Sequence, residues 1–412
     1  MSTEIQARRL LNINNYAYRR GGAETVFLGH ADMFSEAGLG VDLFAMKHPS
    51  NPQGMDETYF TKLIDLEHMP GRLQKAEAAA AIIYNHDARQ NLERLIKARK
   101  PDVAHAHNIY HHISPAILPL LKSYGVPTVL TAHDLKLACP SYKMLSNGVV
   151  CERCKGGKIW NTVSERCLKS SLPLSGLIAV ESAIHKSLGL YRRNLDRIVA
   201  PSQFYKRKLE EWGWPADMVR YIPNFVADTP VEPGQGGSGA ILYFGRLSDE
   251  KGISTLIRAA AQAKTPVNIA GTGPLADELK QLALDLAAPV TFLGYRQGAD
   301  LAELIATAEA IALPSEWNEN APMSVLEAYL HSRPVAGANI GGIPELIVEG
   351  ETGWLFPSGD QEALAAILRQ VFDTPPAIRS TMGRAGGDLV RREFSRAAYR
   401  QRVLELYGEL LG

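Results

Sequence analysis

Short apolar segments, each followed by a polar or glycine-containing turn and then a helical pattern, recur along the whole chain. Such segments are typical of buried strands and stand at 9–14, 40–46, 102–107, 127–132, 195–202, 219–224, 240–247, 267–274, 290–294, 310–313 and 334–337. Because strands that alternate with helices pair in parallel, the pattern predicts an α/β fold. Ligands of such sheets bind at the carboxyl ends of the strands, so the segments after the strands are the first place to look for function.

Length and charge narrow the class of protein. With 412 residues, of which 46% are hydrophobic, the chain is long enough for two or three domains with full cores. Basic and acidic residues both number 44, and a net charge of zero argues against a nucleic-acid binder held by bulk charge. The sequence has no apolar run of about 20 residues and no apolar signal core at its start. We expect a cytoplasmic protein, and peripheral contact with the inner face of a membrane stays open.

A stretch rich in glycine and proline at 232–239 has the composition of a linker. It divides the chain into a first domain at 1–228, a linker at 229–239, a second domain at 240–390 and a last helix at 391–412. Apolar residues at helical spacing predict one long helix over 72–98.

The segment 314–330 brings acids to the start of a predicted helix. Asn320 is the expected N-cap, and Pro322 suits the first turn. Glu319 and Glu327 stand about 12 Å apart along the axis, which is too far for an acid–base pair but suits the two ends of an elongated polar ligand. The helix amides between them form a natural anion site. The alternative is that both acids are ordinary solvated residues.

Two cations and several glycines follow strands. Arg246 and Lys251 flank one short loop beside a helix start, an arrangement that suits a diphosphate. Because the Gly21-Gly22 turn is not a GxGxxG motif, an ordinary tight turn is the favoured interpretation of that turn taken alone. The glycines that would let a ligand approach the backbone are Gly21, Gly22, Gly245, Gly271, Gly273, Gly341 and Gly342.

Histidines cluster around the third strand, but no acid or cysteine beside them completes a metal site. We expect these to be structural or to line a pocket: His105, His107, His111 and His112. His133 differs, because it ends the next strand and precedes Asp134. It is the histidine that we expect to act at a site.

All four cysteines lie between 139 and 167, in an insert at 135–170 with few core residues. Their spacing, C-x11-C-x2-C-x12-C, predicts a closed, structural zinc site. The ligands would be Cys139, Cys151, Cys154 and Cys167. Without a secretion signal, metal is favoured over disulfides. An iron–sulfur cluster, a redox CxxC pair and four unrelated thiols are the alternatives.

Basic residues gather between 186 and 208, interleaved with acids, which is typical of a solvated face. Weak attraction for anionic lipid headgroups is the alternative. They are Lys186, Arg192, Arg193, Arg197, Lys206, Arg207 and Lys208.

Several motifs also stand in a characteristic order. The second half carries Gly245-Arg246-Leu247, Glu250-Lys251-Gly252, Ala270-Gly271-Thr272-Gly273-Pro274, Pro314-Ser315, Glu319 with Glu327, Gly341-Gly342-Ile343-Pro344-Glu345 and Gly353-Trp354-Leu355-Phe356. The first half carries Gly21-Gly22, His133-Asp134 and Ala200-Pro201-Ser202. Over essentially its whole length, the chain resembles family 4 of the retaining GT-B glycosyltransferases.

The resemblance implies two Rossmann-like domains with parallel sheets that face a central cleft. The first domain would hold the acceptor, and the second a UDP- or GDP-sugar donor. Arg246 and Lys251 would hold the diphosphate and stabilise the departing nucleotide. Glu327 would bind the ribose hydroxyls, and Glu319 the hydroxyls of the transferred sugar. The resemblance implies no metal in the chemistry, because the two cations take its place, and transfer with retention by same-face attack assisted by the leaving phosphate.

The resemblance also implies that His133 positions the sugar and that Gly22 lies against the donor phosphates or the acceptor. The phosphate and the sugar would be capped by Asn320, Ala321, Pro322, Met323, Ser324 and Val325. The last helix would pack back onto the first domain. A cysteine cluster after the His-Asp pair occurs in some members but is no part of the shared core, so the resemblance does not carry an acceptor over to this chain.

The sequence therefore predicts a retaining glycosyltransferase of the hexosyltransferase type. Its acceptor would be a sugar or a lipid-linked sugar, in polysaccharide or glycolipid biosynthesis, with no nucleic-acid partner. One alternative is a nucleotide-sugar processing enzyme of the same fold, such as a hexosamine 2-epimerase. The other is a zinc-dependent binding module.

Overall fold

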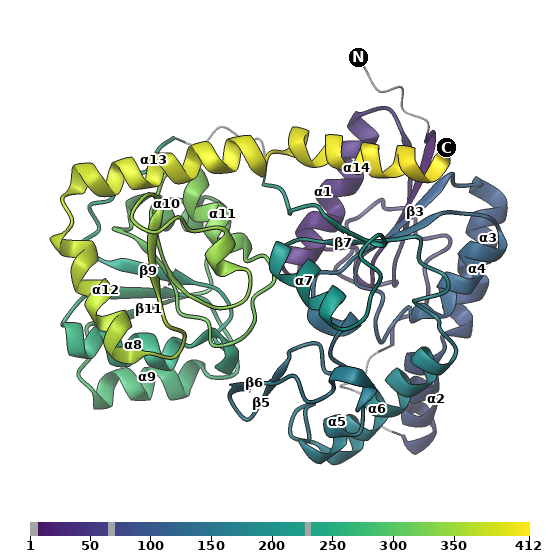
Figure 1. Ribbon diagram of the computed structural model, residues 1–412, viewed down its shortest axis with the longest axis horizontal. Coiled ribbons are helices and arrows are strands. Elements are labelled where there is room, and N and C mark those ends of the chain that lie inside the picture. The colour runs from purple at the N-terminus through teal and green to yellow at the C-terminus, as the bar shows by residue number, and fades with distance from the viewer. Residues whose placement is uncertain (1–6, 65–70, 227–231) are drawn as a thin grey trace.

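The computed structural model describes residues 7–64, 71–226 and 232–412 and contains two parallel six-stranded sheets, which lie in two halves placed side by side (Figure 1). The start of the chain and residues 229–231 of the predicted linker lie outside the described residues. The first sheet consists of β1 (Arg9–Ile13), β2 (Gly40–Phe44), β3 (Val103–Ala106), β4 (Thr128–Thr131), β7 (Arg197–Ala200) and β8 (Val219–Tyr221). The second consists of β9 (Ile241–Phe244), β10 (Val267–Ala270), β11 (Val290–Gly294), β12 (Ile311–Leu313), β13 (Val335–Ala338) and β14 (Gly353–Phe356).

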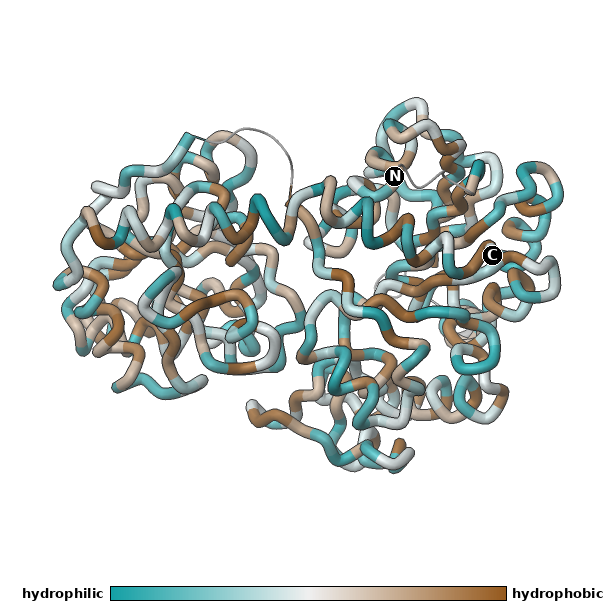
Figure 2. Tube along the Cα trace, turned by 45° about the horizontal axis from the view of Figure 1, so that its top comes forward, coloured by the Kyte–Doolittle hydropathy of each residue, from teal (hydrophilic) through white to brown (hydrophobic). Residues whose placement is uncertain are grey.

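The strand order confirms the predicted parallel α/β architecture. The first sheet runs β2-β1-β3-β4-β7-β8 and the second β11-β10-β9-β12-β13-β14, and every neighbouring pair within them is parallel. The inner strands β3, β4, β12 and β13 are buried along their whole length. Parallel strands are covered by helices on both faces, so they are apolar throughout, and Figure 2 shows hydrophobic chain inside each half.

One of the predicted helices is two helices in the structure. The long helix expected over 72–98 is two helices, which meet at Tyr84 and Asn85. The Asn85 side chain accepts a hydrogen bond from the Ala88 amide, so Asn85 is an N-cap that starts a second helix. The helices are α1 (Gly22–Glu36), α2 (Arg72–Ile83), α3 (His86–Arg99), α4 (Leu118–Ser123), α5 (Asn161–Ser164), α6 (Leu172–Ser187), α7 (Gln203–Glu211), α8 (Ile253–Ala263), α9 (Ala276–Asp285), α10 (Gly298–Thr307), α11 (Met323–Leu330), α12 (Gln361–Asp373), α13 (Pro376–Glu393) and α14 (Arg396–Leu411).

The last helix belongs to the core of the first half. After α13, which covers the second half, α14 crosses over and runs along the first half (Figure 1). Tyr399, Val403 and Tyr407 of α14 share one hydrophobic cluster with Leu10 of β1 and Phe34 of α1. The two ends of the chain therefore build one core.

Glycines let the turns after neighbouring strands of the second sheet pack tightly together. A Cβ at Gly271 would overlap the Gly245 carbonyl, and a Cβ at Gly273 would overlap the Leu247 backbone. Gly245 and Gly271 also have positive φ angles of 149° and 153°, which other residues rarely adopt. The space beside Gly271 and Gly273 is thus filled by protein backbone, whereas the sequence interpretation places a ligand there.

The segment 135–170 joins β4 to α6 and contains little regular structure. It holds the short antiparallel pair β5 (Leu145–Ser146) and β6 (Val149–Val150), and then α5. In the described ranges, no helix combines the length and the apolar character needed to cross a membrane.

Candidate active site

The carboxyl edge of the second sheet brings together a cation and an acid that are 68 residues apart. Lys251 Nζ donates to Glu319 Oε1 at 2.6 Å, and the Ser315 hydroxyl donates to the same oxygen at 2.8 Å. Glu319 is buried, while Lys251 is half-buried and its ammonium also lies 5.4 Å from the centre of the Trp317 ring. The pair holds Lys251 in place and uses one of its three N–H donors, so two donors remain for a ligand.

The other predicted cation and acid have no partner in the described structure. Arg246 follows β9 and is exposed, and its guanidinium makes no ion pair or hydrogen bond to the described residues. Glu327 lies on α11, half-buried and equally without a partner, and burial raises its pKa to about 7. A desolvated carboxylate without a donor is an unfilled acceptor site.

Asn320 is not the N-cap of α11, as the sequence predicted. The helix starts at Met323, with Pro322 in the cap position, and Asn320 instead joins the two halves of the molecule. Its Nδ2 donates to the Ala132 carbonyl at 2.9 Å and the His133 carbonyl at 3.2 Å, and its Oδ1 accepts from the Ser202 hydroxyl at 2.8 Å. Partners from the first half therefore override the local capping preference.

Four backbone amides before and at the start of α11 have no acceptor in the described structure. Pro322 has no N–H, and the Val325 amide donates to the Pro322 carbonyl at 3.2 Å. Of the predicted segment, this leaves the amides of Asn320, Ala321, Met323 and Ser324 unpaired among the described residues. The start of α1 faces them, because a Cβ on Gly22 would lie 3.3 Å from the Met323 side chain, and Gly21 is the N-cap of α1. Two helix starts thus converge, each an anion-binding element.

His133 ends a chain of hydrogen bonds that sequence reasoning did not find. Asn12 Nδ2 donates to the Phe27 carbonyl at 2.9 Å, so Asn12 Oδ1 is left as the acceptor, 3.1 Å from His107 Nε2. His107 Nδ1 then lies 2.8 Å from His133 Nε2. The two imidazole rings stack with centres 5.1 Å apart.

This chain fixes the tautomer of His133. The Phe27 carbonyl can only accept, so His107 must donate from Nε2 to Asn12. Burial lowers the pKa of His107 well below its ordinary value and lowers that of His133 to about 4, so both rings are neutral. His107 Nδ1 is therefore an acceptor, and His133 carries its proton on Nε2. The remaining lone pair, on His133 Nδ1, has no partner among the described residues and is available to a hydroxyl.

A second buried network of hydrogen bonds holds α14 against the first half of the molecule. His105 contacts Thr131 Oγ1 at 2.7 Å and the Tyr407 hydroxyl at 2.6 Å. His30 contacts the same Tyr407 hydroxyl at 3.1 Å and the Tyr399 hydroxyl at 2.9 Å. His105 is therefore structural, as the sequence suggested, whereas His107 supports His133 directly.

The structure does not support the predicted zinc site. Among the described residues, no group of three or more histidine, cysteine, aspartate or glutamate side chains is placed to hold a metal ion. Cys139 instead contacts the Ser141 hydroxyl at 3.3 Å, and Cys154 the Thr162 hydroxyl at 3.6 Å. Burial, reinforced by the other thiols, raises the pKa of Cys154 and raises that of Cys167 to about 12. With Cys151, these residues are four free cysteines.

Glu316, which had no predicted task, ties two elements together. Its carboxylate accepts from the Thr255 hydroxyl of α8, and its amide donates to the Glu250 carbonyl at 2.9 Å. It therefore holds the 314–320 loop against the loop that carries Lys251.

Solved structures share this fold. Sucrose-phosphate synthase from Thermosynechococcus elongatus aligns with a TM-score of 0.73 at 20% identity and covers 98% of this chain and 99% of that one. The Anabaena protein HepE, in complex with UDP and glucose, aligns with a TM-score of 0.64 at 18% identity and covers 98% of this chain and 100% of its own.

Relatives by sequence agree with the fold. D-inositol 3-phosphate glycosyltransferase from Corynebacterium aurimucosum is 26% identical over 95% of this chain and 91% of its own length. Alpha-maltose-1-phosphate synthase from Mycobacterium tuberculosis is 27% identical over 74% of this chain and 78% of its own length. The family described as Glycosyltransferase Family 4 matches residues 20–229, and the one described as Glycosyl transferases group 1 matches residues 230–387. The chain therefore belongs to family 4 of the GT-B glycosyltransferases.

Proposed function

We propose that this glycosyltransferase moves a sugar from a UDP- or GDP-sugar to a hydroxyl of a sugar or lipid-linked sugar, with retention of anomeric configuration. The observation that carries the proposal is the set of unpaired groups at the start of α11. Free amides there stand with Arg246 and the Lys251–Glu319 pair at the end of the second sheet. Free amides and cations suit a diphosphate.

The carboxylates suit the two ends of the donor. Glu327 has no partner, and two adjacent ribose hydroxyls would supply the donors that it lacks. Glu319 Oε1 is occupied by Lys251 and Ser315, so its other oxygen would accept a hydroxyl of the transferred sugar. In this arrangement Glu319 both orients Lys251 and contacts the sugar.

The leaving diphosphate is the centre of the proposed chemistry. As the bond between the sugar and the phosphate breaks, negative charge grows on the phosphate oxygen, and Arg246, Lys251 and the α11 amides stabilise it. The same oxygen takes the proton of the acceptor hydroxyl, which attacks on the same face, so configuration is retained. His133 Nδ1 accepts a hydrogen bond from a hydroxyl of the transferred sugar and positions the sugar ring. The two cations take the place that a metal ion holds in other nucleotide sites.

The test is acceptor-dependent release of nucleotide. We expect UDP or GDP release to require an acceptor, and Lys251→Ala to lower turnover by about 100-fold or more, because it removes charge stabilisation from the transition state. Lys280→Ala, which removes an exposed lysine of α9, is the matched control and should keep wild-type turnover. Near-normal turnover in Lys251→Ala would refute the site assignment.

The second candidate, nucleotide-sugar processing without transfer, is separated by the same assay. An epimerase would convert the nucleotide sugar or release nucleotide without any acceptor. Arg246 and the Lys251–Glu319 pair, which would stabilise a departing diphosphate and hold the transferred sugar, favour transfer.

A further inference from the structure

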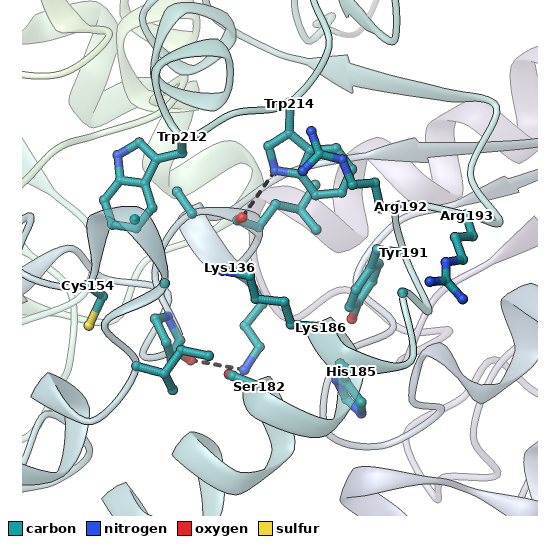
Figure 3. A pocket seen from close by; sticks show the side chains of 17 residues that line it. Lys136, Cys154, Ser182, His185, Lys186, Tyr191, Arg192, Arg193, Trp212 and Trp214 are labelled. Carbon is teal, nitrogen blue, oxygen red and sulfur yellow. Dashed lines mark hydrogen bonds between the residues drawn. The ribbon is translucent and has the colours of Figure 1, made fainter.

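We propose that a cavity in the first half, apart from the candidate active site, binds a phosphate group of the acceptor. This inference rests on the proposed function for its biological meaning, but its physical basis is separate. The cavity has a volume of about 360 Å³ and lies between α6, the turn after it, the segment after α7 and residues 136–140 (Figure 3). Its size falls in the range of small-molecule sites, about 300–1,000 Å³.

Uncompensated positive charge is the first feature of this cavity. Of the seven cations between 186 and 208, four are within ion-pair distance of carboxylates: Arg197, Lys206, Arg207 and Lys208. The other three, Lys186, Arg192 and Arg193, have no carboxylate partner among the described residues, and all three line the cavity. The lining contains no aspartate or glutamate. The remaining lysine of the lining, Lys136, is neutralised by Glu181 at 2.7 Å.

Unpaired hydrogen-bond donors are the second feature. The indole N–H of Trp212 and the hydroxyl of Tyr191 are buried and have no partner in the described structure, and both residues line the cavity. Buried donors without acceptors are costly, about 1–3 kcal/mol each, so such a pair indicates a missing acceptor. A ligand rich in oxygen would satisfy both.

The three cations are exposed side chains, and Arg192 is held at the cavity wall by contacts with the fold. The Arg192 guanidinium donates to the Gly213 carbonyl and lies 5.8 Å from the centre of the Trp214 ring. Lys186 and Arg193 lie against Gly157 and Gly189, where a Cβ would come within 3 Å of their side chains. Those two glycines leave the room that the long basic side chains occupy.

The position of the cavity connects it with the acceptor side. The wall of the cavity at 136–140 starts three residues after His133. The Asp134 carboxylate accepts a hydrogen bond from the Lys136 amide at 2.9 Å. The proposed donor groups stand on the other half of the molecule. A phosphate in the cavity, bound by three cations and two neutral donors, would therefore belong to the acceptor, as a sugar phosphate in solution or a lipid-linked phosphate.

The test measures phosphate binding with the donor site filled. With the full chain saturated with UDP, or with GDP if UDP does not bind, inorganic pyrophosphate is titrated and the tryptophan fluorescence is followed, because Trp212 and Trp214 line the cavity. We expect saturable binding, weakened about tenfold or more in Lys186→Gln with Arg193→Gln. Lys206→Gln, which removes a nearby lysine paired with Glu210, should change the affinity less than twofold.

The outcomes separate this proposal from the proposed function. Equal pyrophosphate affinity in wild type and double variant, or equal weakening in the Lys206→Gln control, would overturn the cavity proposal while UDP binding stands. Failure of both UDP and GDP to bind would refute the donor site, and comparison of the same variants would still decide the cavity. Competition by glucose 1-phosphate would identify a soluble acceptor, and competition by vesicles carrying polyprenyl phosphate a lipid-linked one.

Discussion

Glu327, a buried carboxylate in the proposed donor site, should lower the stability of the folded protein by a measurable amount. Burial without a partner raises its pKa from the ordinary value of 4.5 to about 7. Between these pH values the folded protein binds more protons than the unfolded chain, so stability falls as the pH rises and the loss is complete above pH 7. At 1.36 kcal/mol per pKa unit the full shift is worth about 3 kcal/mol, and solvent screening of this half-buried side chain reduces it to about 2 kcal/mol.

Glu327→Gln keeps the shape of the side chain and removes the charge. At pH 8 we expect the variant to be more stable than the wild type by about 2 kcal/mol, or about 4–8 °C in melting temperature for a folding unit the size of the second half. At pH 4.5 the difference should vanish. The measurement is thermal unfolding across this pH range, with Glu303→Gln on the exposed face of α10 as the control.

The same variant should bind UDP or GDP more weakly, because the neutral amide replaces the carboxylate that we assign to the ribose. In the wild type, nucleotide affinity should rise with pH through about 7, as the carboxylate ionises. A Glu327→Gln protein that is no more stable than the wild type at pH 8 would refute the unpaired, buried carboxylate. Unchanged nucleotide affinity would refute its role in the site.

Three further predictions concern other parts of the molecule. His107→Phe removes the acceptor of the His133 Nε2 proton, so ¹⁵N NMR should show a mixture of His133 tautomers in place of one, and kcat should fall about fivefold, the value of one neutral hydrogen bond; a single unchanged tautomer would contradict the hydrogen-bond chain. Asn320→Ala removes three hydrogen bonds between the halves, so small-angle X-ray scattering should show a larger radius of gyration, and an unchanged radius would show that other contacts close the molecule. Cys154 and Cys167, whose pKa values are raised, should react slowly with a thiol reagent at pH 7.5, and four thiols per chain should react after unfolding in the presence of a chelator. Rapid reaction in the folded state would contradict the raised pKa values, and metal analysis of the same sample tests the zinc hypothesis independently.

Much of the fold follows from local pattern. Strands and helices were predictable because apolar periodicity reflects burial on one face or on two. The break at Asn85 was missed because asparagine is equally at home on the surface of a helix, and only its bond to the Ala88 amide marks a new start. Local pattern thus locates elements better than it locates their ends.

The site was predictable in its parts but not in its pairings. Lys251 and Glu319 were both identified, but as separate ligand contacts, since nothing in the sequence shows that side chains 68 residues apart form one ion pair. His107 was expected only to be structural or to line a pocket, because its role depends on Asn12, 95 residues earlier in the chain, and on His133. Asn320 was misassigned because partners from the other half outweigh a local capping preference.

The crossing of α14 has a consequence for how the protein is made. Tyr399 and Tyr407 supply the hydroxyl partners of His30 and His105, which are fully buried among residues that are synthesised first. Until α14 leaves the ribosome during translation, His30 lacks both of these hydrogen-bond partners and His105 has only the Thr131 hydroxyl. The core of the first half is therefore completed only after α14 has been synthesised, and a fragment that ends before α14 would expose part of that core.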